Sequence, residues 1–90
     1  MGYTVYILQS EISGVFYKGY TSNLESRLWE HNNGLSRYTK DKGPWKLVYT
    51  KSFDNKKDAL IFERKIKRFN VQSLKNLIKN YSSGEDGSGD

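Results

Sequence analysis

Two apolar segments at the start of the chain have the residue types of β-strands. Residues 3–9 are rich in β-branched and aromatic types, and residues 15–20 resume that pattern after a short polar turn. The two segments therefore predict an antiparallel hairpin. Ser22 stands three residues before Glu25, which is the spacing of a capping box, and this predicts a helix that opens at Ser22. The Asn-Asn-Gly sequence at 32–34 is expected to end it.

Beyond this helix the hydrophobic pattern becomes polar and then alternates. Residues 35–44 are expected to form the longest internal loop, and residues 45–49 a third strand. Alternation along this strand predicts that one face carries Trp45, Leu47 and Tyr49.

Two helical periodicities follow. Asp54 or Asn55 is expected to cap the first helix, whose apolar positions recur at helical spacing. These positions are Ala59, Phe62, Ile66 and Phe69. Gln72 or Ser73 is expected to start the second helix. Its inward positions are Leu74, Leu77, Ile78 and Tyr81. The resulting order, β-β-α-β-α-α, predicts an α+β fold in which helices flank a small three-stranded antiparallel sheet.

Length and composition indicate one small domain. Ninety residues support a single core, expected over residues 1–81, while residues 82–90 contain nothing to bury and are expected to form a disordered acidic tail. The absence of cysteine excludes disulfides and thiolate metal sites. No apolar run is long enough to span a membrane, and the first residues do not resemble a signal peptide, so a soluble cytoplasmic protein is expected.

The charge of the predicted domain is strongly positive. Residues 1–81 hold fifteen Lys and Arg against seven Asp and Glu, a formal charge of +8. Such an excess favours a polyanionic partner, and DNA is expected, although the same charge also suits a solvated surface. The residues expected to contact the DNA backbone are Lys40, Lys42, Lys46, Arg64, Lys65, Lys67 and Arg68. Phosphate contacts of this kind carry no base code.

Two short aromatic motifs lie on the predicted hairpin: Thr-Val-Tyr at 4–6 and Tyr-Lys-Gly at 17–19. Their spacing, followed by the predicted helix, resembles the GIY-YIG nuclease superfamily. The pattern is similar to that of its small stand-alone members, which resemble the amino-terminal domain of the DNA-repair nuclease subunit UvrC. Further blocks that look like this family extend the resemblance over residues 3–79.

The resemblance implies a nuclease that uses one divalent metal, Mg²⁺ or Mn²⁺, and it implies a role for five residues. Tyr6 and Tyr17 occupy the tyrosines of the two motifs. Arg27 is the helix arginine of the family, and His31 aligns with a histidine common in the stand-alone members. Glu63 matches the metal-binding glutamate. Each residue alone would more commonly be a packing tyrosine, a surface arginine, a helix cap or an ion-paired glutamate.

These residue types suit phosphodiester hydrolysis, which needs a proton acceptor for water and positive charge beside the phosphoryl oxygens. The two phenols share a face of the hairpin if Tyr6 and Tyr17 pair directly or two residues apart. Arg27 can fork onto phosphate oxygens, and His31, one helical turn later, is expected to relay a proton. Glu63 suffices for a Mg²⁺ ion that keeps most of its waters.

The expected function is a structure-selective, metal-dependent DNA endonuclease. The alternative is a nucleic-acid-binding module of the same fold that lost the reaction or needs a partner to cut. This alternative rests on the small size of the chain and on Lys18, which stands where the second motif usually has an apolar or small residue. A protein-interaction domain is a third, weaker alternative. The sequence leaves the oligomeric state and any protein partner open.

Overall fold

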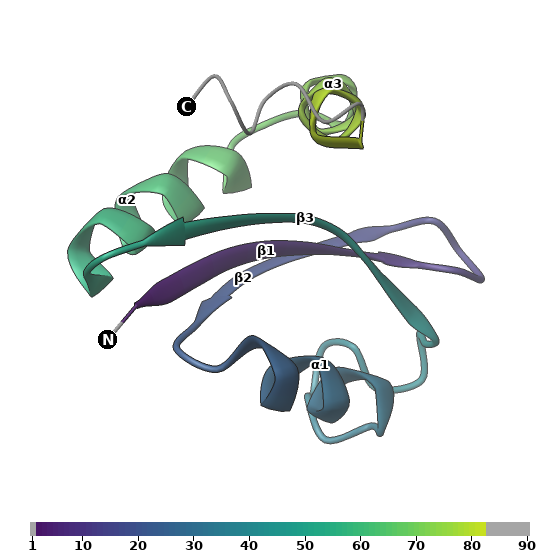
Figure 1. Cartoon of the computed structure of the whole chain (residues 1–90). Helices are drawn as coiled ribbons and strands as arrows, with labels where there is room; N and C mark the ends of the chain where they lie inside the picture. The colour runs from purple at the N-terminus through teal and green to yellow at the C-terminus, as the bar shows by residue number, and fades with distance from the viewer. Residues whose placement is uncertain (1, 83–90) are drawn as a thin grey trace.

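The computed structural model describes residues 2–82 and contains three strands and three helices (Figure 1). In chain order they are β1 (Tyr3–Ser10), β2 (Phe16–Thr21), α1 (Leu24–Asn32), β3 (Trp45–Phe53), α2 (Lys56–Lys67) and α3 (Val71–Ser82). This confirms the predicted β-β-α-β-α-α order and the α+β class. The predicted acidic tail, apart from Ser82 at the end of α3, lies outside the described residues.

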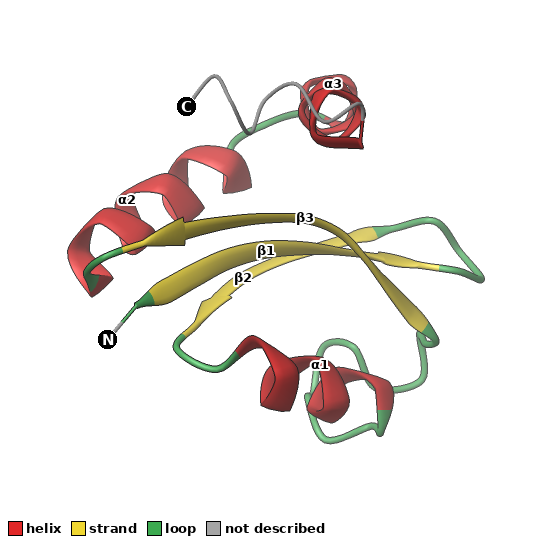
Figure 2. Cartoon of the chain, in the orientation of Figure 1, coloured by secondary structure: helices red, strands yellow, loops and turns green. Residues whose placement is uncertain are grey.

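The sheet has the strand order β2-β1-β3, and both pairings are antiparallel. Helices α2 and α3 lie on one side of it, whereas α1 and the loop that follows lie on the other (Figure 2). The central strand β1 is therefore covered on both faces, and its residues from Val5 to Leu8 are all buried. Successive side chains of a strand point to opposite faces, so β1 contributes to two separate cores.

The larger core lies between the sheet and helices α2 and α3. Val5 and Ile7 of β1 pack there with Ala59, Ile66 and Leu74. This confirms most of the apolar stripes predicted for the last two helices. Tyr81, predicted to face inward, has 37% of its surface exposed, although its ring centroid lies 5.0 Å from that of Tyr49. The smaller core lies on the α1 side, where Tyr6 and Leu8 pack with Trp45 of β3.

A bulge in β3 changes which face its side chains occupy. Ile7 pairs with Tyr49 but Leu8 pairs with Leu47, so Val48 is an extra residue in the ladder. Leu47 packs on the α1 side, whereas Val48 and Tyr49 both pack against the larger core. The prediction that Tyr49 shares a face with Trp45 and Leu47 was wrong, because strict alternation does not hold across a bulge.

Asparagine side chains set the starts of the helices. Asn23, not Ser22, caps α1, because its side-chain oxygen accepts a hydrogen bond from the Ser26 backbone N–H at 3.1 Å. The capping-box prediction was therefore off by one residue, since Ser and Asn cap helices about equally well and the extended backbone that a cap needs occurs at Asn23. Asn55 caps α2, as one of the two predicted alternatives. Asn70 accepts from the Ser73 N–H at 2.8 Å, and α3 begins before the predicted start.

Candidate active site

The register of the hairpin places two tyrosines on the same face of the sheet. Tyr6 of β1 pairs with Gly19, and Tyr17 of β2 pairs with Leu8, so the two tyrosines are offset by two residues. Both side chains point toward α1, and their ring centroids are 6.3 Å apart. The condition under which the two phenols share a face is therefore met.

Gly19 makes room for these two rings. A Cβ atom at this position would lie 2.7 Å from the Tyr6 hydroxyl oxygen and 3.2 Å from the Tyr17 ring. The Tyr6 phenol is rigid and buried, so it has no free space into which it can retreat. The glycine of the second motif thus serves a close approach of side chains, a role that the motif spacing alone did not reveal.

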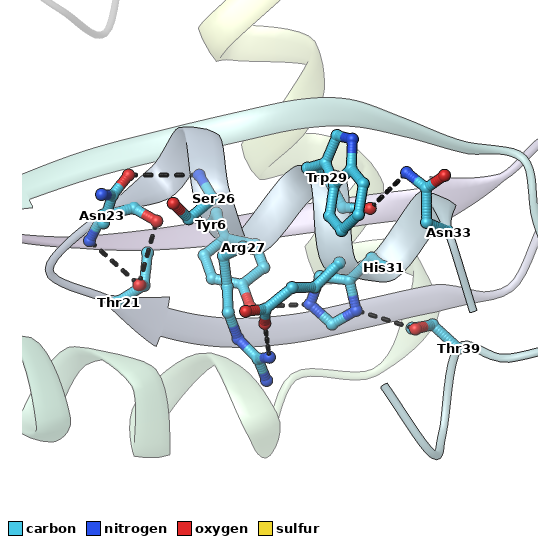
Figure 3. A network of polar contacts seen from close by, with 10 residues as sticks. Tyr6, Thr21, Asn23, Ser26, Arg27, Trp29, His31, Asn33 and Thr39 are labelled. Atoms are coloured by element: carbon cyan, nitrogen blue, oxygen red, sulfur yellow. Dashed lines mark hydrogen bonds and ion pairs between the residues drawn. The ribbon is translucent and has the colours of Figure 1, made fainter. Parts of the chain in front are cut away.

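His31 of α1 connects Tyr6 to the loop after the helix. Its Nε2 lies 3.0 Å from the Tyr6 hydroxyl, and its Nδ1 lies 2.8 Å from the Thr39 hydroxyl, as Figure 3 shows. Its ring centroid is 4.8 Å from that of Tyr17. Tyr6, His31 and Thr39 are almost completely buried, each with 1% of its surface exposed. Sequence reasoning found Tyr6 and His31 but missed Thr39, which is distant in sequence from Tyr6.

Burial controls the protonation of this network. It lowers the pKa of His31 to about 4, and the charge of Arg27 lowers it as well, so the imidazole is neutral at pH 7. Burial also raises the pKa of Tyr6 above its ordinary value. The neighbouring Tyr17 raises it further, while Arg27 acts in the opposite direction. Tyr6 therefore carries its proton in the free protein, and positive charge nearby favours the release of that proton.

Arg27 lies at the solvent side of the network and is held by Glu30. Its Nη1 donates to a Glu30 carboxylate oxygen at 2.7 Å, and about a third of the arginine side chain is exposed. This contact raises the pKa of Arg27. Glu30 leaves most guanidinium donors unused, because a guanidinium has five N–H groups. The arginine is therefore placed near Tyr6 with donors that can still bind an anion.

Glu63 projects from α2 and is buried, with 7% of its surface exposed. Within residues 2–82 its polar contact is Lys67, whose Nζ lies 3.3 Å from the carboxylate. The Glu63 charge raises the pKa of Tyr6, and Lys67 lines the same hollow as Tyr17. Glu63 is thus electrostatically linked to the phenols, although it comes from the helix layer on the other side of the sheet.

A single carboxylate of this kind fits a magnesium-type ion. Mg²⁺ is commonly held by one or two carboxylates, keeps several waters and takes substrate phosphate as a further ligand. Among the described residues no group of three or more His, Asp and Glu side chains gathers to form a closed metal site. The donor set therefore suits an ion completed by water and phosphate, and it does not suit zinc, which needs three or four protein ligands.

An aromatic side chain from the loop covers the second phenol. Tyr38 stacks on Tyr17 with ring centroids 5.5 Å apart, and half of its surface is exposed. The Lys42 ammonium lies 4.8 Å from the centroid of the Tyr38 ring. Together with Lys18 and Lys67, these tyrosines line a hollow beside the network. Sequence reasoning missed Tyr38, because only the return of the loop toward the hairpin brings it here.

The seven predicted DNA contacts are spread over several parts of the structure, of which the α2 groove and the hollow beside Tyr17 share Lys67. Arg64, Lys65 and Arg68 line an open groove on α2 that Lys67 also borders. Lys42 lies at Tyr38, whereas Lys46 borders the turn between β1 and β2, and Lys40 is exposed in the loop. The structure thus divides the positive charge between the α2 groove, the site and the hairpin end.

A comparison with protein families assigns the chain to a family. The sequence profile of the GIY-YIG catalytic domain matches residues 2–79. The chain belongs to the GIY-YIG family. This is a family of nuclease domains, and the resemblance drawn from the two aromatic motifs is confirmed.

Small stand-alone proteins of the same family are similar over most of their length. A UPF0213 protein of Clostridium perfringens is 41% identical over 83 residues, which cover 91% of this chain and 88% of that protein. A UPF0213 protein of Staphylococcus saprophyticus is 41% identical over 82% of this chain and 90% of its own. The solution NMR structure of a UPF0213 protein from Bacillus halodurans superposes with a TM-score of 0.58 at 32% identity, covering 88% and 84% of the two chains.

Within residues 2–82, none of the GIY-YIG domain's helices has both the length and the apolar character that crossing a bilayer requires.

Proposed function

We propose that this GIY-YIG protein is a metal-dependent endonuclease that hydrolyses phosphodiester bonds in DNA and selects its substrate by shape. The observation that carries the proposal is the convergence of Tyr6, Tyr17, Arg27 and His31 on one side of the sheet. Three of these side chains are in direct contact. The Tyr6 hydroxyl lies 3.0 Å from His31 Nε2, and the Tyr17 ring packs on the rings of Tyr6 and His31. These residues come from two strands and one helix, so the fold itself gathers them.

Tyr6 and Arg27 have roles in hydrolysis that their surroundings support. Hydrolysis adds a hydroxyl group to phosphorus and a proton to the departing oxygen, so the attacking water must lose a proton to a base. Tyr6 is our candidate for that base once its own hydroxyl proton has left. The raised pKa of Tyr6 opposes the loss of this proton, and the charge of Arg27 lowers that pKa. The unused guanidinium donors of Arg27 neutralise the charge that develops on the phosphoryl oxygens. Tyr17 is the second phenol of the site and packs between Tyr6 and Tyr38.

Glu63 is the residue that would hold Mg²⁺ or Mn²⁺. The ion, when bound, supplies positive charge for the departing 3′ oxygen. Glu63 is buried, pairs with one lysine and acts electrostatically on Tyr6, which fits this assignment, because buried charges in proteins are paired or coordinate metals.

Shape selection is proposed from the distribution of charge. Arg64, Lys65 and Arg68 form a basic groove beside the site, and contacts of such side chains with phosphate do not read bases. Branched DNA presents two backbones in a geometry that plain duplex lacks. We therefore expect flaps or junctions to be cut faster than duplex of the same length.

Cleavage of labelled flap, junction, single-stranded and duplex DNA tests the proposal, with Mg²⁺, with Mn²⁺ and with EDTA. Glu63→Gln should abolish metal-dependent cleavage, whereas Glu25→Gln, a change of the same type at an exposed position of α1, should leave it intact. Both variants should keep the fold and the affinity for DNA. Cleavage that survives Glu63→Gln or EDTA would overturn the metal-dependent mechanism.

One observation favours a DNA-binding module without turnover as the second candidate. Arg27 and Glu63 each form an ion pair within the chain, Arg27 with Glu30 and Glu63 with Lys67, which reduces the charge that each offers to a ligand. A site in this state binds DNA through its surface cations without offering charge to the reaction. Multiple turnovers by the purified protein would exclude this candidate, and salt-sensitive binding of DNA without any turnover would favour it.

A further inference from the structure

Thr39 is a buried residue of the loop between α1 and β3 that points its hydroxyl at His31. Its backbone oxygen accepts hydrogen bonds from the Trp45 indole N–H at 3.0 Å and from the Lys42 backbone N–H at 3.2 Å. The residue is therefore held in place independently of its side chain. Its hydroxyl lies 2.8 Å from His31 Nδ1, and within residues 2–82 this nitrogen is the hydroxyl's hydrogen-bond partner (Figure 3).

The three groups can share their protons in two ways, because a neutral imidazole has one donor and one acceptor nitrogen. In the first arrangement Tyr6 donates to Nε2, and Nδ1–H donates to Thr39. The hydroxyl hydrogen of Thr39 is then left in the protein interior without an acceptor. In the second arrangement Thr39 donates to Nδ1, and Nε2–H donates to the Tyr6 oxygen. The hydrogen of the Tyr6 hydroxyl is then free to face the site.

The surroundings of the two hydroxyls favour the second arrangement. An unsatisfied donor inside a protein costs about 1–3 kcal/mol, and Thr39 and Tyr6 each have only 1% of their surface exposed, so exposure alone does not separate the two arrangements. The Thr39 hydroxyl has His31 Nδ1 as its partner within residues 2–82, whereas the Tyr6 hydroxyl lies among the groups of the site, Tyr17, Arg27 and Glu63, where water and phosphate oxygens arrive in the proposed reaction. The arrangement in which the Thr39 hydroxyl has an acceptor therefore leaves one donor unused. That donor is the Tyr6 hydroxyl, at the place where a substrate oxygen can accept its hydrogen bond.

We propose that Thr39 donates its hydroxyl hydrogen to Nδ1 of His31 and thereby holds the imidazole in the Nε2–H tautomer, which donates a hydrogen bond to the Tyr6 oxygen. Thr39 is then a positioning residue that acts through His31. This assignment differs from a proton relay, because Nε2 already carries a hydrogen and does not take one from Tyr6.

The consequence for catalysis rests on the proposed function. A hydrogen bond donated to the Tyr6 oxygen stabilises the phenolate, which is the form that removes a proton from water. The charged and titratable groups around this oxygen are Tyr17 on β2, Arg27 on α1 and Glu63 on α2. Arg27 supports the phenolate, whereas the other two groups oppose it. The hydrogen bond from His31 Nε2–H therefore acts together with the charge of Arg27 to stabilise the Tyr6 phenolate.

The tautomer is measured directly, because His31 is the only histidine of the chain. A long-range ¹H–¹⁵N correlation spectrum of the protein at pH 7 shows which ring nitrogen carries the hydrogen. We expect protonated Nε2 and unprotonated Nδ1 in the wild type and in Thr39→Ser, which keeps the hydroxyl. Thr39→Val keeps the volume but removes the donor, so Tyr6 can donate to Nε2 and the two nitrogen signals should move toward each other. A wild-type spectrum with protonated Nδ1 would overturn the proposal.

Cleavage kinetics test the consequence separately. Thr39→Val should lower kcat about tenfold, the effect of losing about one hydrogen bond, with KM for DNA unchanged because Thr39 lies behind His31. Thr39→Ser should restore kcat, which a role in packing the methyl group would not predict. A Thr39→Val protein that keeps both the wild-type spectrum and the wild-type kcat contradicts the assignment. If no variant cleaves DNA, the proposed function fails, and the spectrum alone still decides the tautomer.

Discussion

Gly19 lies directly opposite Tyr6 in the sheet, and it leaves just enough space for the Tyr6 hydroxyl. A Cβ atom there would lie 2.7 Å from that oxygen and 2.9 Å from the ring carbon that bears it. The two motifs of the hairpin are therefore parts of one packing arrangement, in which the second motif accommodates the phenol supplied by the first. This arrangement sets the direction in which Tyr6 reaches His31.

Gly19→Ala should therefore damage the site as well as the fold. The added methyl group must displace a rigid buried phenol, and overpacking of this kind costs about 1–3 kcal/mol. We expect a loss of unfolding free energy in that range, measured by chemical denaturation, together with lower cleavage activity. Gly14→Ala is a useful comparison, because a Cβ there would have its nearest contact at 4.0 Å, although its φ of +81° adds backbone strain of its own. Gly19→Ala with wild-type activity would show that the phenol can move without loss.

The neutral state of His31 predicts a specific loss of stability in acid. An unfolded histidine has a pKa of about 6.5, whereas burial lowers the pKa of His31 to about 4. Because the folded pKa is the lower one, the unfolded chain binds the extra proton as pH falls below about 6.5. The stabilising contribution of His31 is complete above that pH and is lost progressively down to about pH 4, at a cost on the order of 2–3 kcal/mol.

Denaturation at several pH values from 7.5 down to 5 checks this prediction above the range in which most carboxylates titrate. The wild type should lose unfolding free energy over that range. His31→Gln should show a flatter profile, since no other histidine is present in the chain. Equal slopes for the two proteins would mean that His31 does not carry the acid sensitivity.

The arrangement of the strands and helices could be predicted because local patterns determine most of it. The apolar stripes on α2 and α3 recur at helical spacing, and most of their residues pack against the larger core as expected, with Tyr81 the exception. The bulge at Val48 could not be predicted, since it arises from the pairing of β3 with β1 and leaves no mark in the alternation. The start of α1 was misplaced for a related reason: Ser22 and Asn23 both have capping side chains, and only the backbone geometry selects Asn23.

The candidate site was predictable where its residues belong to short motifs. Tyr6, Tyr17, Arg27 and His31 lie on adjacent elements, and the structure brings them together on one face. Their catalytic roles stay predictions. Thr39 was not predictable, because it lies in a polar loop and becomes a partner of His31 only when that loop returns to the α1 side of the sheet (Figure 2).

The basic groove on α2 predicts how affinity for DNA depends on salt. Each cation that contacts a phosphate contributes about one unit to the slope of log affinity against log salt concentration. Arg64→Ala should therefore reduce the slope by about one unit and weaken binding to all sequences alike. Lys79→Ala, near the end of α3, removes the same charge outside the groove and should leave the slope nearly unchanged. Matching slopes for both variants would exclude the groove as the main DNA contact.

Lys67 should influence metal binding, because it holds the carboxylate that we assign to the metal. Its Nζ lies 3.3 Å from Glu63, and its side chain is about half exposed, so the ion pair itself is worth only about 0.2–1 kcal/mol. A divalent ion must compete with this ammonium for the same carboxylate. Removing it in Lys67→Met should tighten the binding of Mn²⁺ by about twofold to fivefold in the absence of DNA.

Titration calorimetry with Mn²⁺ measures this change, and Lys65→Met serves as the matched control. Lys65 is exposed on the same helix, but Lys67 is the residue that forms the ion pair with Glu63. Lys67→Met should also weaken binding to DNA, because Lys67 lines the hollow beside Tyr17 and Tyr38. Tighter binding of Mn²⁺ together with weaker binding of DNA by Lys67→Met would place Lys67 between the two ligands. A Lys67→Met protein that binds Mn²⁺ no better than Lys65→Met would indicate that the metal does not bind at Glu63.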